Sequence, residues 1–243
     1  MADTQTLTPD HDPMGAAIRD YLHVGRASTL RVLSTMFDED EMPVAHLFRS
    51  AQTMPPLERR ALALARGRVL DVGAGAGCHA LALQERGLEV KAIDISPLSV
   101  EAMRERGVAD AECINLYDTR LGGRFDTILL LMNGTGIAGR VDNLPRLLDR
   151  LRSLMADGAQ VLVDSSDLRY IFEDEDGNLD LDDDQTYYGE VDYQMIYDDV
   201  EGLPFRWLYV DFPLLKAVAA TCGLKAELVA EGEQNDYLAR LTL

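Results

Sequence analysis

The sequence predicts an α/β protein with a doubly wound, mostly parallel seven-stranded sheet and helices on both faces. Two observations carry this prediction. From residue 68 onward, β-rich apolar runs alternate with segments of helical length. A glycine-rich turn at 73–77 also leads directly from the first of these runs into a helix-like segment. Such alternation is typical of a parallel sheet wound by right-handed crossovers.

The strands are expected at short apolar runs bounded by turn or cap residues. These runs cover residues 68–74, 89–96, 110–117, 125–133, 159–167, 225–232 and 236–243. Glycines close two of the helical patterns between them, and Ser96-Pro97 supplies an N-cap followed by proline at the first helical position. The helices are expected at residues 78–87, 97–107, 144–155 and 212–223.

The N-terminal part has a different pattern. Residues 1–13 are polar and acidic, and we expect a disordered tail there. Apolar residues then recur at helical spacing over 14–37, and further helical stretches are expected at 44–53 and 57–67. We therefore expect residues 1–60 to form a tail and a helical cap in front of a domain that covers 61–243.

An insertion of about 168–210 follows the fifth strand. It holds an acidic stretch at 173–185 and two runs, 189–199 and 204–211, that predict an antiparallel hairpin. The acidic stretch matches a calcium loop at three positions, but Phe172 and Asp183 stand where that loop needs its first and last ligands. We expect a solvated acidic loop and no metal site.

Composition excludes several functions. The chain of 243 residues carries 42 acidic and 23 basic side chains, a net charge of -19, so it is an acidic protein that repels nucleic acid and anionic membranes. Its three cysteines are widely spaced and suggest neither a disulfide framework nor a zinc site. No signal peptide pattern or membrane-length apolar run is present, so we expect a cytoplasmic protein.

Two glycine turns compete as a nucleotide site. Gly134, Gly136 and Gly139 match the dinucleotide pattern G-x-G-x-x-G, but the next helix is expected to start three or more residues beyond Gly139. The turn at 73–77 runs straight into a helix, whose free N–H groups can face a ligand. It also has a well-placed acid, because Asp94 ends the next strand, 21 residues after Gly73. We therefore favour the turn at 73–77 and expect the later glycines to form a flexible rim.

The ligand of this turn is expected to differ from a dinucleotide. Cys78 stands where the third glycine of G-x-G-x-x-G is needed, and Asp71 lies two residues before Gly73. A carboxylate so close to the turn would repel a pyrophosphate, whereas it would attract a ligand that bears an ammonium group.

With "VLDVGAGAG", "VKAIDIS" and "RFDTILLLMN" in this order, the chain resembles the class I, Rossmann-like S-adenosylmethionine-dependent methyltransferases. The resemblance covers about residues 65–243 and implies a seven-stranded sheet with an antiparallel last strand, S-adenosyl-L-methionine as cofactor and S-adenosyl-L-homocysteine as product. It also implies a set of cofactor-binding residues. They are Asp71, Gly73, Gly75, Gly77, Asp94, Ile95, Asn115, Leu116 and Met132, with Asn115 departing from the acid that the family often has there.

Methyl transfer from a sulfonium is an in-line displacement, so alignment can supply much of the acceleration without a prominent catalytic motif. Asn133 is our first candidate for positioning the acceptor, with a turn residue as the alternative. His79 is a candidate base or a buried packing residue, and Tyr21 either closes over the substrate or packs in the core. Tyr187, Tyr188 and Trp207 either line the acceptor pocket or only pack.

We therefore predict a methyltransferase that acts on a small-molecule acceptor beneath a lid. A protein acceptor and a homodimer are both compatible with the sequence. Two other classes of protein stay open. One is an NAD-dependent oxidoreductase that uses the turn from Gly134 to Gly139, and the other is a non-catalytic module that binds a cofactor or a partner.

Overall fold

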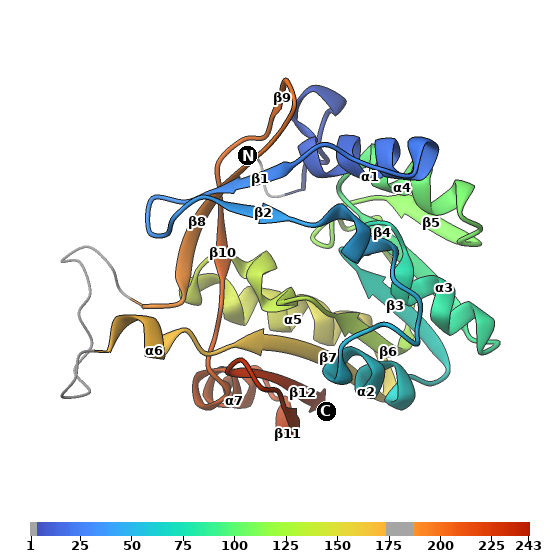
Figure 1. Ribbon diagram of the computed structural model, residues 1–243. Helices are drawn as coiled ribbons and strands as arrows, with labels where there is room; N and C mark the ends of the chain where they lie inside the picture. Colours follow the sequence, from blue (N-terminus) through green and yellow to red (C-terminus); the bar gives the residue numbers. More distant parts are fainter. Residues whose placement is uncertain (1–3, 174–186) are drawn as a thin grey trace.

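A seven-stranded sheet with the strand order β11-β12-β7-β6-β3-β4-β5 forms the centre of the protein. The computed structural model describes residues 4–173 and 187–243 (Figure 1). The strands are β3 (Arg68–Val72), β4 (Glu89–Asp94), β5 (Asp110–Cys113), β6 (Phe125–Leu130), β7 (Met155–Ser166), β11 (Lys225–Glu231) and β12 (Asp236–Thr242). The five strands from β3 to β7 pair in parallel, and β12 runs antiparallel to β7. The predicted fold class and its antiparallel last strand are confirmed.

Helices cover both faces of this sheet because its strands are apolar on both sides. The helices are α2 (Pro56–Leu64), α3 (Cys78–Glu85), α4 (Pro97–Glu105), α5 (Leu144–Leu154) and α7 (Phe212–Thr221). Leu70 and Ile128 pack in one core cluster with α5 and α7, whereas Val69 and Leu129 pack in another with α2, α3 and α4. Neighbouring residues of one strand thus point to opposite layers, as the two-residue period of a strand requires.

A second sheet, which we call the cap sheet, joins two distant parts of the chain. Its order is β10-β8-β1-β2, and β9 pairs with β8. The strands are β1 (Leu30–Leu33), β2 (Asp40–Met42), β8 (Glu190–Tyr197), β9 (Val200–Glu201) and β10 (Phe205–Leu208). The predicted hairpin is confirmed, because β8 and β10 pair antiparallel, but β8 also pairs with β1. The cap sheet lies across the carboxyl ends of the parallel strands (Figure 1).

Three predictions for the N-terminal part are wrong. The helix predicted for 14–37 is α1 (Pro13–Val24), which ends at Gly25 in the left-handed region, with φ of 76°. Strand β1 follows it, and the backbone of β8 supplies hydrogen-bond partners for this strand. The helix predicted for 44–53 is only a 3-10 turn, η2 (Val44–Phe48). The tail predicted to be disordered has a defined conformation from residue 4 to 12, although most of its residues are exposed, and it includes η1 (Pro9–His11).

The acidic stretch predicted as a loop lies outside the described residues, apart from Glu173. The short helix α6 (Arg169–Phe172) precedes it. Within residues 4–173 and 187–243, we find no helix that is long and apolar enough to cross a membrane.

The second glycine run joins the cap sheet to the central sheet. It forms η3 (Gly134–Ala138), and α5 begins only at Leu144, which confirms that its helix starts late. Gly136 is buried, and a Cβ on it would overlap the indole ring of Trp207 on β10. The expectation of a flexible rim is therefore wrong at Gly136. Glycine is required there because the Trp207 ring lies too close for any side chain.

We predict that Gly136→Ala destabilises the protein by about 1–3 kcal/mol, the usual cost of overpacking a filled site. Urea unfolding measures the change in the free energy of unfolding. Gly122→Ala is the matched control, because Gly122 has ordinary φ and the nearest atom to its Cβ would be a carbonyl oxygen 4.0 Å away. Equal losses in both variants would contradict the packing role of Gly136.

Candidate active site

The turn between β3 and α3 leaves room for a ligand against its backbone. Gly73, Gly75 and Gly77 have φ of 69°, 54° and 80°, which other residues rarely adopt. A Cβ on Gly75 would meet no atom within 4 Å, and one on Gly73 only Ile137 Cδ1 at 4.0 Å. A Cβ on Gly77 would lie 2.9 Å from Met103 Cγ. The first two glycines thus border open space, whereas the third packs α3 against α4.

Asp94 is held against this turn by two backbone amides. Its Oδ2 accepts from the Gly75 N–H at 2.8 Å, and its Oδ1 accepts from the Ser96 N–H at 2.9 Å. Burial raises the pKa of Asp94 to about 6, although these amide bonds oppose the shift. The carboxylate therefore lies at the end of β4 beside the open part of the turn.

Asp71 offers an unused acceptor behind the same turn. The Ala80 amide donates to its carboxylate, so Asp71 caps the first turn of α3 in place of Gly77, which has no side chain. Its side chain is buried, and Oδ2 has no hydrogen-bond partner within the described residues. Burial raises the pKa of this carboxyl. A buried oxygen of this kind is costly unless a ligand satisfies it.

Strand β6 ends in a strained turn that a third carboxylate holds. Met132 and Asn133 have φ of 66° and 58°, in the left-handed region. Their N–H groups donate to the Asp164 carboxylate at 3.1 and 2.8 Å. Ser166 Oγ donates to Asn133 Oδ1 at 3.0 Å, which turns the amide nitrogen of Asn133 to other partners. Strain of this kind persists where the surroundings fix it, often at functional sites.

The predicted adenine-side residues lie at the ends of β4 and β5, with different exposure. Ile95 is 37% exposed, and Asn115 accepts from the Tyr117 N–H and donates to the carbonyl of Gln5 at 3.2 Å. Leu116 is buried in the core, and its carbonyl accepts from Arg150. The structure brings Ile95 and Asn115 to the surface of the site but not the side chain of Leu116.

His79 and Tyr21 have packing partners. His79 is 5% exposed, and its Nε2 lies 2.8 Å from Glu58 Oε2, which also pairs with Arg49. The ring of Tyr21 packs against that of Phe48, with centroids 4.7 Å apart. Each contact corresponds to the packing alternative that the sequence leaves open for that residue.

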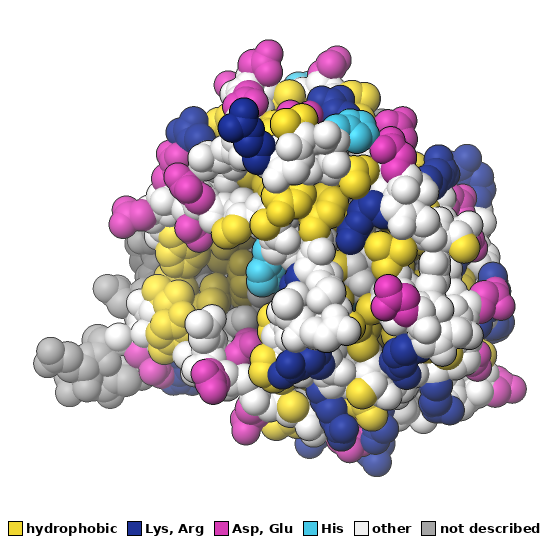
Figure 2. All heavy atoms as spheres, turned by 45° about the vertical axis from the view of Figure 1, so that its right-hand side comes forward, with side chains coloured by type: hydrophobic (Ala, Val, Ile, Leu, Met, Phe, Trp, Pro, Cys, Tyr) yellow, Lys and Arg dark blue, Asp and Glu magenta, His cyan; other side chains and the backbone are white. Residues whose placement is uncertain are grey.

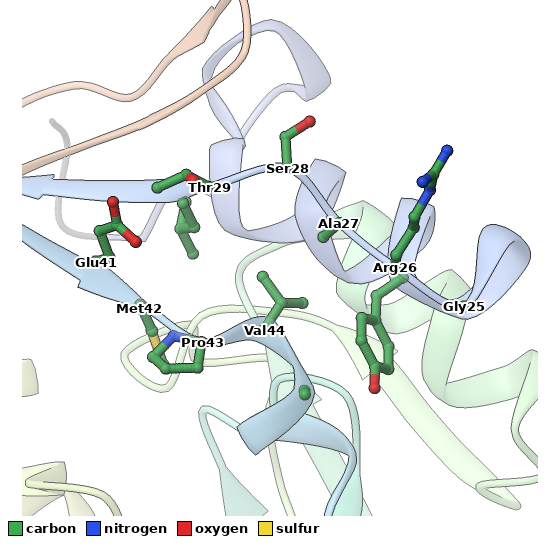
Figure 3. A pocket seen from close by; sticks show the side chains of 12 residues that line it. Gly25, Arg26, Ala27, Ser28, Thr29, Glu41, Met42, Pro43 and Val44 are labelled. Atoms are coloured by element: carbon green, nitrogen blue, oxygen red, sulfur yellow. The ribbon is translucent and has the colours of Figure 1, made fainter.

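An open cavity of about 330 Å³ lies between the segment after α1 and the segment after β2. Ala27 and Val44 point toward each other there, and Arg26 points away (Figure 3). Tyr21 lines the cavity, whereas the glycine turn and Asn133 do not. The cavity is therefore separate from the site at the carboxyl edge.

Comparison with known proteins defines the class of this site. A family model described as a methyltransferase domain matches residues 45–200. A SAM-dependent methyltransferase from Bacteroides fragilis, solved in complex with S-adenosyl-L-homocysteine, is 57% identical over 100% of this chain and 99% of its own, with a TM-score of 0.94. The chain belongs to the SAM-dependent methyltransferases, and S-adenosyl-L-methionine is its cofactor.

More distant structures share the fold. The CcbJ methyltransferase from Streptomyces caelestis is 19% identical over 79% of this chain and 92% of its own, with a TM-score of 0.59. The sugar N-methyltransferase KedS8 from Streptoalloteichus is 17% identical over 79% of this chain and 87% of its own, with a TM-score of 0.51. The methyltransferase reading of the sequence is confirmed, and the oxidoreductase alternative is not supported.

Three residues of the site were missed or underrated in the sequence. The sequence places Asp164 at a strand end, where it could face the acceptor or merely cap the next segment, and the structure shows that it holds the turn after the neighbouring strand. Glu58 and Asp12 gave no signal, because each acts on a residue far away in the chain. A buried acid cannot be told from a surface acid by residue type alone.

We predict a pH-dependent difference in stability between wild type and Asp164→Asn. Burial raises the pKa of Asp164 to about 6, above about 3.9 in the unfolded chain, so the folded state binds the proton more tightly. Raising the pH from about 4 to about 6 should therefore cost wild type about 2 kcal/mol relative to the variant. Urea unfolding at both pH values measures this change, and a change in favour of wild type would contradict it.

Proposed function

We propose that the protein methylates a small-molecule acceptor bound between the carboxyl edge of the central sheet and the cap sheet. In this proposal residues 1–60 and the insertion at about 168–210 form the acceptor-binding cover, and the rest of the chain binds the cofactor. The observation that carries the proposal is that one face of the cap sheet is turned toward the carboxyl edge.

Aromatic and sulfur-bearing side chains occupy that face. In the pairing of β8 with β10, Tyr193 lies opposite Phe205 and Val191 lies opposite Trp207, so the four side chains share one face of the cap sheet. This face meets the carboxyl edge of the central sheet at Gly136, which Trp207 covers. The ring centroids of Tyr193 and Phe205 are 6.1 Å apart. By the two-residue period, Met195 lies on the same face, and it belongs to one apolar cluster with Met132. The cap sheet thus supplies an apolar wall near the end of β6.

This arrangement favours a small acceptor. Figure 2 shows a hollow walled by hydrophobic side chains below the cap sheet. Enclosed, mostly apolar sites with a few polar groups are typical of small-molecule pockets. The net charge of -19 also disfavours a nucleic acid acceptor.

The residues at the turn fit the cofactor. The open backbone at Gly73 and Gly75 would hold its methionine part and ribose, and the Asp94 carboxylate would accept from the ribose hydroxyls. The unpartnered Oδ2 of Asp71 suits its amino group, directly or through water. Ile95 and Asn115 would border the adenine. For Leu116 only backbone contact is compatible with its burial.

The cofactor supplies a methyl group on a sulfonium, and the chain supplies alignment. Met132 would flank that methyl. Asn133, whose Oδ1 is engaged by Ser166, would donate an N–H from its amide nitrogen to a lone pair of the acceptor. The strained turn and the Asp164 carboxylate keep this side chain in place without reorganisation during the reaction. His79 and Tyr21 support the turn and the cap through their packing.

Asp94→Ala should weaken binding of S-adenosyl-L-homocysteine by at least about tenfold, because charge-assisted bonds to the ribose are lost. Calorimetry measures the affinity and the fraction of binding-competent protein separately. Glu101→Ala is the matched control, since Glu101 is an exposed acid on neighbouring α4. Equal affinity of Asp94→Ala and wild type would remove the ribose assignment.

With methyl-labelled S-adenosyl-L-methionine and a cell extract separated by molecular mass, the label should appear in the small-molecule fraction. An apolar wall suits a small acceptor, and the net charge of -19 disfavours a nucleic acid. Recovery of the label mainly in protein or nucleic acid would overturn the small-molecule proposal. Extract incubated without the enzyme is the control for background methylation.

A further inference from the structure

The N-terminal segment 5–12, which we call the strap, runs along the predicted adenosine side of the site. The Leu7 N–H donates to the carbonyl of Ile95 at 2.8 Å, and the carbonyl of Gln5 accepts from Asn115 Nδ2 at 3.2 Å. The strap thus contacts the ends of both β4 and β5, at the two residues that border the adenine in the proposed function.

The strap is anchored by a buried carboxylate. Asp12 has no exposed surface, and its Oδ2 accepts from Ser96 Oγ at 2.5 Å. Its Oδ1 accepts from the Gly15 N–H at 2.9 Å and caps α1. A Cβ on Gly15 would overlap the Asp12 carboxylate and the Ser96 hydroxyl, so glycine is needed for this close contact.

Ser96 connects this anchor to the cofactor turn. Its hydroxyl accepts from the Ser99 N–H at 2.9 Å and caps α4, while its own N–H donates to Asp94 Oδ1 at 2.9 Å. Asp94 Oδ2 in turn accepts from the Gly75 N–H. A continuous series of hydrogen bonds therefore runs from Asp12 through Ser96 and Asp94 to the glycine turn.

The far end of the strap reaches the cap sheet. His11 Nδ1 lies 2.9 Å from the carbonyl of Glu201 on β9. Within eight residues the strap contacts the ends of β4 and β5, the start of α4 and the cap. It connects the cofactor side of the protein with the acceptor side.

We propose that the strap is the outer wall of the adenosine site and that Asp12 is a positioning residue, which fixes Asp94 through Ser96 and couples seating of the strap to cofactor binding. This inference rests on the proposed role of Asp94 at the ribose. When a binding-competent state is populated for only a fraction of the time, the apparent Kd rises by the inverse of that fraction. Loosening the anchor should therefore weaken ligands that carry the adenosine group.

The test variant is Asp12→Ser. Serine is a good N-cap, so it can keep the Gly15 contact of α1, but its single oxygen cannot also serve Ser96. Asp10→Ser is the matched control, because Asp10 is an exposed acid of the same strap. Calorimetry with S-adenosyl-L-homocysteine and with 5′-methylthioadenosine measures binding of the whole product and of its adenosine part.

Asp12→Ser should raise the Kd of both ligands by the same factor, about tenfold or more, with unchanged stoichiometry. Asp10→Ser should bind as wild type. Loss of affinity for S-adenosyl-L-homocysteine alone, or affinities within about twofold of wild type, would overturn the inference. If Asp94→Ala also bound as wild type, the ribose assignment of the proposed function would fail as well, so the two failures are distinguishable.

Hydrogen exchange of wild type gives a second test that needs no variant. Saturating S-adenosyl-L-homocysteine should slow exchange of the Leu7 amide, because the bound ligand favours the seated strap. Unchanged exchange at Leu7 would overturn the coupling even if Asp12→Ser failed to fold.

Discussion

The contact on which the site depends is that of the Asp94 carboxylate with the backbone amides of Gly75 and Ser96. One oxygen fixes the glycine turn after β3, and the other fixes the start of α4. Two loops from adjacent strands are thereby held at one carboxyl edge. The burial that raises the pKa of Asp94 to about 6 is opposed by these amides. The conformation of the glycine turn thus depends on the Asp94 carboxylate, which the fold has partly removed from water.

The same device recurs twice at this edge. Asp164, at the end of β7, accepts amides from the turn after β6, and Asp12 accepts from the start of α1 and from Ser96. Asp94 and Asp164 each hold the turn that follows a neighbouring strand, whereas Asp12 caps its own helix α1 and ties it to the Ser96 hydroxyl. Charge-assisted bonds to backbone amides are stronger than neutral ones, so a few acids can stiffen loops that carry little apolar packing. Some of the acidic residues of this chain are therefore structural parts of its site.

The features that could be predicted from the sequence are those that depend on residues close together in the chain. The turn at 73–77, Asp94 and the alternating strands are local patterns, and they were predicted with the correct class of fold. The strands after α1 were not predicted. Leu30 and Leu33 fit a helical spacing, and their strand partners in β8 lie more than 150 positions away in the chain. Gly25 was a usable sign that the helix ends there. The role of Asp12 had no local sign, since its partner Ser96 is 84 residues away.

The cap sheet shows why the acceptor side is harder to derive than the cofactor side. The cap sheet combines β1 and β2 from the N-terminal part with β8, β9 and β10 from the insertion, so neither segment alone contains the whole sheet. Because their backbones share hydrogen bonds, the two segments cannot move apart without breaking those bonds. His11 ties the strap to this sheet through β9, and Leu7 ties it to the end of β4. If the strap has the role that we propose, a change of position in the cap sheet would reach the proposed adenosine side through these two contacts.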